Sequence, residues 1–273
     1  MKLKIFNATG VQTGETDLPS QFNEPVRVDL IKKAVLAIQN NRRQAYGPRE
    51  KAGMIHAVRI SKRRRDFKGC YGKGISRVPR KTMSHRGSQF FWVGANAPGM
   101  VGGRRAHPPK TETVRGWKLN TKERRKAICS ALSAVMIKEA VVRRGHFVPE
   151  NYPFIVADDF EKINKTKQLL EALTKLGFEN ELIRAFEPRA RAGKGKLRGR
   201  RKITKKSLLL AVSDVNEISK AASNLLGIDV INVKKLNAGA LAPGGHVGRA
   251  TLFTTKALEE IKKGLFTNKG IGK

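Results

Sequence analysis

Acidic side chains are scarce in this chain, and their scarcity indicates the class of partner. Only 22 of the 273 residues are Asp or Glu, against 56 Lys and Arg. The formal net charge is therefore +34 at pH 7, and the isoelectric point is about 10.8. This excess is far larger than solubility requires, so we expect a polyanionic partner, in the first place a nucleic acid. A membrane surface would call for an amphipathic basic helix, whereas Gly and Pro interrupt the basic runs here.

Long apolar runs and paired cysteines are also missing. No stretch approaches the ~18 apolar residues of a transmembrane helix. Residues 1–7 lack the apolar core of a signal peptide, so we expect a cytoplasmic protein with no membrane partner. Cys70 and Cys129 lie far apart in the sequence, without a C-x-x-C motif and without His at zinc-ligand spacing. This spacing argues against a disulfide framework and against a zinc site, and it predicts two free thiols.

Hydrophobic periodicity is almost absent from residues 47–110. This stretch holds sixteen Lys and Arg but only two acids, Glu50 and Asp66. A loop beyond about 12–15 residues without secondary structure is generally functional or disordered. With so little apolar side-chain volume, the stretch cannot offset the entropy of its own ordering, and its like charges repel. We therefore expect it to become ordered on a negatively charged partner.

The rest of the chain alternates between helical and strand patterns. Residues 26–45 and 120–145 carry apolar groups at helical spacing, and Asn120 with Glu123 forms a capping box at the start of the second helix. Further on, a strand–helix–strand pattern occurs twice. The predicted strands are residues 154–156, 182–186, 208–212 and 230–236, and the predicted helices are one that ends at Gly177 and one that runs from Asp214, with Glu217 in its capping box, to Gly227.

This alternation predicts an α/β fold. We expect a three-layer domain with a mainly parallel sheet and helices on both faces, formed by residues 1–46 and 111–273. Residues 47–110 would then be one long extended internal loop, inserted between two helices of that domain. The roughly 200 residues outside the loop are enough for one sizeable core.

No catalytic or cofactor motif accompanies this fold. A dinucleotide site would need a glycine-rich turn between strand and helix. The corresponding turns carry Asp158, Asp159 and Asp214 instead, and their carboxylates would repel phosphate. P-loop, G-x-S-x-G and H-E-x-x-H motifs are absent, and the five histidines are scattered. We therefore expect no enzymatic activity, no cofactor, no metal and no small-molecule substrate.

Three basic segments carry the binding hypothesis. Residues 47–110 combine the cluster KRRR at 62–65 with aromatic residues interleaved with Gly and Arg, and the alternative is a disordered tail that binds any anion. Residues 189–206 are expected to join one strand to the next, and the alternative is a solvated loop. Eleven cations lie between Arg184 and Lys206, against the single acid Glu187. Residues 241–249, LAPGGHVGR, offer either an anion-binding nest before a strand or a plain turn.

These segments contain what RNA recognition requires. Cations meet phosphates, planar rings stack on unpaired bases, and glycines allow the backbone to approach closely. A smooth DNA duplex offers less for such irregular segments to fill. The residues predicted to bind RNA are Lys62, Arg63, Arg64, Arg65, Phe67, Arg86, Trp92, Arg104, Arg105, Arg189, Arg191, Lys194, Lys196, Arg198, Arg200, Arg201, His246 and Arg249.

Four motifs give the chain a family resemblance. They are KAICSAL at 126–132, RAGKGK at 191–196 followed by Arg200-Arg201, Leu236-Asn237, and LAPGGHVGR at 241–249. In this order and over most of the chain, they closely resemble the archaeal and eukaryotic branch of the L-four family of large-subunit ribosomal proteins. The long C-terminal extension of eukaryotic members is absent, so we expect an archaeal member.

The resemblance implies a structural role in the large ribosomal subunit. Family members place an α/β domain on the outer face of the subunit, bind its ribosomal RNA and support its assembly. Their partners include neighbouring ribosomal proteins and the nascent polypeptide. An RNA chaperone or translational regulator that acts off the ribosome is the alternative.

The resemblance also assigns the tip of the long loop. In family members the tip lines the nascent-peptide exit tunnel. The common pattern, G-T-G-R-A followed by further arginines, aligns with residues 72–77, GKGISR, and then 78–80, VPR. Lys73 replaces the usual Thr, and Ile75 replaces the usual Arg. Gly102-Gly103-Arg104 resembles the return strand of the loop and would pack on RNA. The residues expected to line the tunnel are Gly72, Lys73, Gly74, Arg77 and Arg80.

Overall fold

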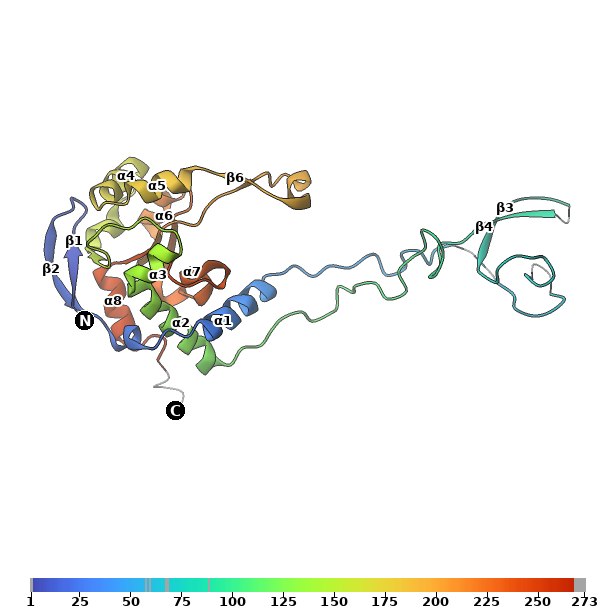
Figure 1. Ribbon diagram of the computed structural model, residues 1–273, viewed down its shortest axis with the longest axis horizontal. Helices are drawn as coiled ribbons and strands as arrows, with labels where there is room; N and C mark the ends of the chain where they lie inside the picture. Colours follow the sequence, from blue (N-terminus) through green and yellow to red (C-terminus); the bar gives the residue numbers. More distant parts are fainter. Residues whose placement is uncertain (1, 57, 59, 67–68, 88, 268–273) are drawn as a thin grey trace. The chain divides into compact units, whose positions relative to one another are not determined.

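The computed structural model describes residues 2–56, 58, 60–66, 69–87 and 89–267 (Figure 1). The chain divides into two compact units. One unit comprises Met1–Arg42 and Gly116–Lys273, and the other comprises Arg43–Arg115. The first unit is a mixed α/β structure with several small sheets, and below it is called the α/β unit. The second is called the loop unit.

Two three-stranded sheets form the centre of the α/β unit. In one sheet the order is β2-β1-β5, with β1 antiparallel to β2 and parallel to β5. In the other the order is β10-β8-β9, and all three strands are parallel. A parallel bridge between Val156 and Thr254 links β5 to the residue after β10. The strands are β1 (Lys2–Phe6), β2 (Gln12–Asp17), β5 (Ile155–Val156), β8 (Leu209–Val212), β9 (Asp229–Asn232) and β10 (Thr251–Phe253).

Strand β8 is buried on both of its faces. Leu209 and Ala211 belong to a hydrophobic cluster that includes residues of α1 (Val28–Asn41), α2 (Thr121–Met136) and α8 (Thr255–Lys262). Leu208 and Leu210, which point the other way, belong to a second cluster with residues of α4 (Thr166–Lys175), α5 (Glu179–Phe186) and α6 (Asn216–Ala222). Successive side chains of a strand point to opposite faces, so an unbroken apolar run such as LLLAV marks a strand covered on both sides.

Several predicted elements differ from those observed. The predicted helix 120–145 is broken at Ile137, whose φ of −89° and ψ of 103° separate α2 from α3 (Lys138–Arg143). Asn120 stands at the N-cap of α2, but its side chain makes no capping hydrogen bond. The second predicted capping box is also absent. Asp214 accepts a hydrogen bond from the amide of Asn216 at 3.2 Å, and α6 begins only after Val215 and ends well before Gly227.

The predicted strand at residues 182–186 is wrong. This segment belongs to helix α5, which buries Leu182 and Ala185 at helical spacing and exposes Ile183. A short apolar run cannot separate the two structures by periodicity alone, and the nearby stop at Gly177 did not exclude a second helix directly after it. At the N-terminus, strands β1 and β2 went unpredicted because their sequences, KLKIF and QTGETD, contain no long apolar run. Strand β9 ends at Asn232, and a 3-10 turn, η4 (Val233–Lys235), replaces the rest of the predicted strand.

The described residues of the loop unit contain a hairpin that the sequence did not predict. Strands β3 (Arg80–Arg86) and β4 (Gln89–Gly94) pair antiparallel, with an irregularity between Thr82 and Ser84. The two legs of the loop unit run side by side (Figure 1). A Cβ at Gly47 would lie 2.8 Å from the carbonyl oxygen of Pro109, so glycine is needed for this approach. Within the described part of the chain, no helix is long and apolar enough to cross a membrane.

Candidate nucleic-acid interface

The basic segment at 189–206 forms a hairpin, which we call the basic arm. It connects helix α5 to strand β8, so the expected connection between two strands is corrected to one between a helix and a strand. Strands β6 (Arg189–Ala190) and β7 (Lys202–Ile203) pair antiparallel, and a 3-10 turn, η3 (Gly193–Arg198), lies between them. Figure 1 shows the arm extending from the end of α5.

Arg191 holds the basic arm together. Its backbone amide donates to the carbonyl oxygen of Arg201 at 2.8 Å, and its Nε donates to that of Arg200 at 2.8 Å. The half-buried guanidinium of Arg191 therefore supports the hairpin, and the other predicted cations surround it on the outside. The exposed RNA-binding candidates of the arm are Arg189, Lys194, Lys196, Arg198, Arg200 and Arg201.

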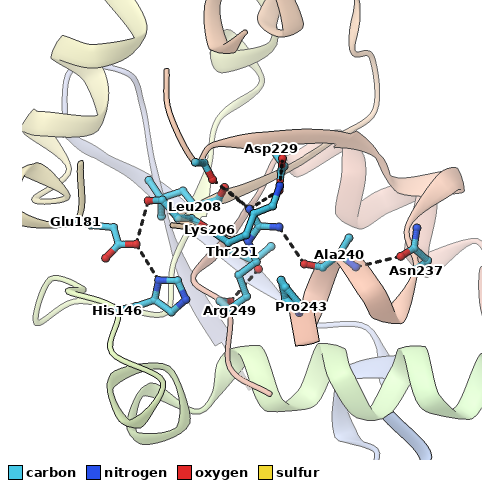
Figure 2. A network of polar contacts seen from close by, with 12 residues as sticks. His146, Glu181, Lys206, Leu208, Asp229, Asn237, Ala240, Pro243, Arg249 and Thr251 are labelled. Carbon is cyan, nitrogen blue, oxygen red and sulfur yellow. Dashed lines mark hydrogen bonds and ion pairs between the residues drawn. The ribbon is translucent and has the colours of Figure 1, made fainter. Parts of the chain in front are cut away.

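A buried carboxylate, Glu181, fixes the base of the arm (Figure 2). Its oxygens accept hydrogen bonds from Arg184 at 2.5 Å, from the ring of His146 at 2.8 Å and from the hydroxyl of Ser207 at 2.9 Å. Arg184 also donates to the carbonyl oxygen of Lys206 at 3.0 Å. Since Arg184 precedes the arm and Ser207 follows it, one carboxylate joins both ends of the hairpin.

Ionisation of this cluster follows from its burial and its donors. Burial alone would raise the pKa of Glu181, but hydrogen bonds from His146 and Arg184 outweigh it and bring the pKa to about 2. Burial lowers the pKa of His146 below its ordinary value despite the neighbouring carboxylate. The imidazole is therefore neutral near pH 7, and it donates to the ionised Glu181 through Nδ1.

Arg249 is the predicted RNA ligand that the structure places in the interior. It is 1% exposed, and its guanidinium donates to the carbonyl oxygens of Ser207 at 2.7 Å and Ala240 at 3.1 Å. It also pairs with Asp229 at 2.6 Å, which Lys206 contacts at 2.8 Å (Figure 2). Burial would raise the pKa of Asp229, but hydrogen bonds from Lys206 and Arg249 leave it lower than usual. In this arrangement the hydrogen bonds of Arg249 join the base of the arm to helix α7 (Ala238–Leu241), which leads into the segment at 241–249. Contact of Arg249 with RNA stays a prediction.

The segment at 241–249 begins at the last residue of the short helix α7, which the side chain of Asn237 caps. It continues through a 3-10 turn, η5 (Pro243–Gly245), toward β10. Gly248, with φ of 86°, lies so close to α3 that a Cβ would be 2.5 Å from the carbonyl oxygen of Ala140. His246, in contrast, is exposed. The expected anion-binding nest of the paired glycines stays a prediction.

Aromatic rings and cations meet along the hairpin of the loop unit. The rings of Phe90 and Trp92 stack with centroids 6.3 Å apart, and His85 lies 5.6 Å from Phe90. Lys73 places its ammonium 4.7 Å from the centre of the Trp92 ring, a cation–π contact that the sequence did not indicate. Lys62, Arg63, Arg64, Arg65, Arg86 and Arg105 are exposed, Arg104 is half-buried, and Phe67 lies outside the described residues.

The predicted loop tip is an organised turn. Gly72 and Gly74 have φ of 71° and 64°, with open space where a Cβ would stand, so glycine serves the turn geometry there. Arg77 lies over the Tyr71 ring at 4.6 Å, and it is exposed, as is Lys73. Arg80 is half-buried and donates to the carbonyl oxygen of Ser76 at 2.6 Å. Lys73 and Arg77 are thus the cations that this turn presents to solvent, while Arg80 holds it.

The expected return strand at Gly102-Gly103-Arg104 is a turn followed by irregular backbone, and the strand that returns along the hairpin is β4. The two cysteines are free, as predicted. Both are buried, and burial raises the pKa of Cys129 to about 11. Across the described ranges no group of three or more His, Cys, Asp or Glu is placed to hold a metal ion.

Comparison with known proteins identifies a family. A model of the ribosomal protein L4/L1 family matches residues 16–264. The chain is 45% identical over 264 residues to a protein of Nanoarchaeum equitans named large ribosomal subunit protein uL4, covering 96% of this chain and 98% of that protein. Proteins of the same name from Archaeoglobus fulgidus and Methanocaldococcus jannaschii are 41% and 42% identical, again over 96% of this chain and over 98% and 99% of theirs.

Replacing Glu181 with Ala should destabilise the α/β unit strongly. The substitution leaves the buried donors of His146, Arg184 and Ser207 without their acceptor, and removing one partner of a buried ion pair costs about 3–5 kcal/mol. Urea unfolding followed by circular dichroism measures the loss. Glu179→Ala, which removes an exposed carboxylate of the same helix, is the control and should stay within about 0.5 kcal/mol. Equal losses in the two variants would contradict the assigned role.

The stability of the protein should fall as the pH drops below 6.5, in part because of His146. Its pKa in the folded protein lies below 6.5, so under acidification the unfolded chain binds a proton that the native state does not. His146→Gln should flatten this part of the pH profile, while the four exposed histidines remain in both proteins. The measurement is the free energy of unfolding between pH 7.5 and 5.5, and parallel profiles would contradict the prediction. The contribution of Glu181 is lost only at lower pH, from its ordinary value of 4.5 down to about 2.

Proposed function

Because the chain belongs to the ribosomal protein L4/L1 family, we propose that it is a structural constituent of the large ribosomal subunit and binds its ribosomal RNA. The observation that carries this proposal is the similarity over 96% of the chain to archaeal proteins named for that subunit. The protein is then not an enzyme, and it acts in the cytoplasm as part of the ribosome. Its partners are ribosomal RNA and the proteins beside it in the subunit.

The basic arm supports RNA binding in particular. Its exposed cations stand on a hairpin whose two ends are joined through Glu181 and whose strands are held by Arg191. A chain of cations on a fixed support meets phosphates with less loss of conformational freedom than a mobile tail does. The arm is therefore proposed to hold the α/β unit on the RNA.

The loop unit is proposed to penetrate the ribosomal RNA and to line the exit tunnel with its tip. Interleaved rings, cations and closely approaching glycine backbone support the contact with RNA. Exposed Lys73 and Arg77 support the contact with the nascent peptide, because long cationic side chains can reach into a passage while their stems pack on its wall. The proposed loop is residues 47–110, and residues 1–46 and 111–273 form the domain that carries it.

We also propose that the two small sheets act as one mainly parallel sheet between two helical layers. The bridge between Val156 and Thr254 supports this arrangement, as do the two hydrophobic clusters that divide the alternate residues of β8. Amide hydrogen exchange measures the free energy at which each strand opens. Different opening free energies for β1 and β8 would contradict the single sheet.

Co-sedimentation tests the proposed function and the role of the arm together. The protein should remain in the large-subunit peak after a moderate-salt wash. The triple change of Arg198, Arg200 and Arg201 to Gln should release it at lower salt, because the dependence of log affinity on log salt falls by roughly 0.7–0.9 per lost phosphate contact. The matched control changes the exposed Lys256, Lys262 and Lys263 to Gln and should release near the wild-type salt. Wild-type protein found only outside the ribosome would contradict the function and favour a free RNA-binding regulator.

Changing Lys73 and Arg77 to Ala should alter how nascent peptides pass the loop tip. It should have little effect on incorporation of the protein into large subunits. Both side chains are exposed, and the contacts described for them are with the Trp92 ring for Lys73 and with the ring and hydroxyl of Tyr71 for Arg77, so their loss costs the turn little. The expected result is changed stalling of tunnel-sensing peptides, read as ribosome position on the messenger. Lys51 and Lys110, exposed cations of the two legs, serve as a charge-matched Ala control. Normal stalling together with lost incorporation would make the tip an assembly anchor.

A further inference from the structure

A surface cavity of about 480 Å³ lies between the start of α1, the end of α3 and the segment at 241–249. Its apolar lining comes from Val28, Ala140 and Val247. Its remaining lining residues are Arg143, Arg144 and His246. Cavities of roughly 300–1,000 Å³ with a largely apolar lining and a few polar groups are typical of sites for small organic ligands.

Internal hydrogen bonds and close backbone packing fix the walls of this cavity. They leave the side chains of His246 and Arg143 available to a ligand. Arg144 donates from one nitrogen to the carbonyl oxygen of Pro243 at 2.7 Å and from another to that of His246, so it fixes the segment to α3. Burial lowers the pKa of Arg144 to about 10, so it remains a cation near pH 7. Gly245 and Gly248, both with positive φ, lie against α1 and α3. This backbone leaves the imidazole of His246 at the surface.

His246 and Arg143 are the groups open to a ligand. Both side chains are exposed, and among the residues that the structure describes the ring of His246 makes no hydrogen bond and Arg143 makes no ion pair. An imidazole face beside apolar groups suits a planar base, and an unpaired guanidinium suits a phosphate. The cavity therefore combines the two chemistries that a nucleotide carries.

We propose that this cavity binds one unpaired nucleotide of the large-subunit ribosomal RNA, with its base stacked on His246 and its phosphate held by Arg143. The inference rests on the proposed function and adds to it a site separate from the basic arm. Val28 and Ala140 supply apolar lining for the base. The LAPGGHVGR segment then forms one wall of a base-binding site. This role differs from both the plain turn and the anion-binding nest that its glycines suggest.

Two substitutions of His246 test the stacking. Affinity is measured for ribosomal RNA extracted from the large subunit, at fixed salt. His246→Ala should weaken binding by roughly five- to a hundred-fold, the range for one base stacked on an aromatic ring. His246→Phe keeps a planar ring and should restore most of the affinity. An unchanged affinity in His246→Ala, or an equal loss in both variants, would overturn the proposal.

A second pair of variants tests the cavity itself. Val28→Trp should fill it and weaken RNA binding, whereas Val11→Trp, an equally large change at an exposed valine of the same unit, should not. Arg143→Gln should weaken binding more than Lys220→Gln, which removes one exposed charge from α6. Circular dichroism establishes that each variant is folded before its affinity is compared. Equal effects within either pair would overturn the site.

Ultraviolet cross-linking separates this proposal from the proposed function. In isolated large subunits, the peptide that contains His246 should cross-link to a single nucleotide, and the cross-link should be lost in Val28→Trp. A protein that resides in the subunit without this cross-link would overturn the nucleotide site and leave the ribosomal role intact. Absence of the protein from the subunit would overturn the ribosomal role.

Discussion

With 56 cationic side chains and only 22 acidic ones, this chain can bury a cation only where carboxylates or carbonyl oxygens accept its hydrogen bonds. The α/β unit meets this condition at the base of the basic arm. There Glu181 binds Arg184, and Asp229 binds both Arg249 and Lys206. These two carboxylates offset the local repulsion so that a segment with eleven cations can leave and re-enter the domain at fixed points.

The two long basic segments contain different kinds of internal contact. In the basic arm, side-chain hydrogen bonds of Arg191 and the carboxylate of Glu181 replace a hydrophobic core. In the loop unit, glycines let the two legs approach each other, and rings stacked on rings and cations hold the hairpin. Cation–π contacts of this kind contribute about 0.5–1 kcal/mol at exposed sites, so they organise the surface without making it rigid.

The sequence predicted the mixed α/β class and several of its elements, but not every helix and strand. Strand β8 and helices α1 and α4 could be found because LLLAV and the helical spacing of apolar residues reflect burial directly. The error at residues 182–186 had a physical cause, since five residues fit either period and only the packing of Leu182 and Ala185 decides between them. Hairpin β3–β4 was not predicted, because the aromatic run FFWV fits a base-stacking surface as well as it fits a strand.

The residue types pointed to the candidate interface. Which arginines are exposed and which are buried depends on three-dimensional contacts that spacing in the sequence does not show. Arg200 and Arg249 are both arginines in basic, glycine-containing segments, yet one is exposed and the other is 1% exposed among carbonyl oxygens. The difference comes from Asp229, which lies twenty residues before Arg249 in the sequence and beside it in space. In a chain with this charge, each acid is therefore informative. The buried carboxylate of Glu181 holds the guanidinium of Arg184 in place, whereas the exposed arginines of the basic arm stay candidates for contact with RNA.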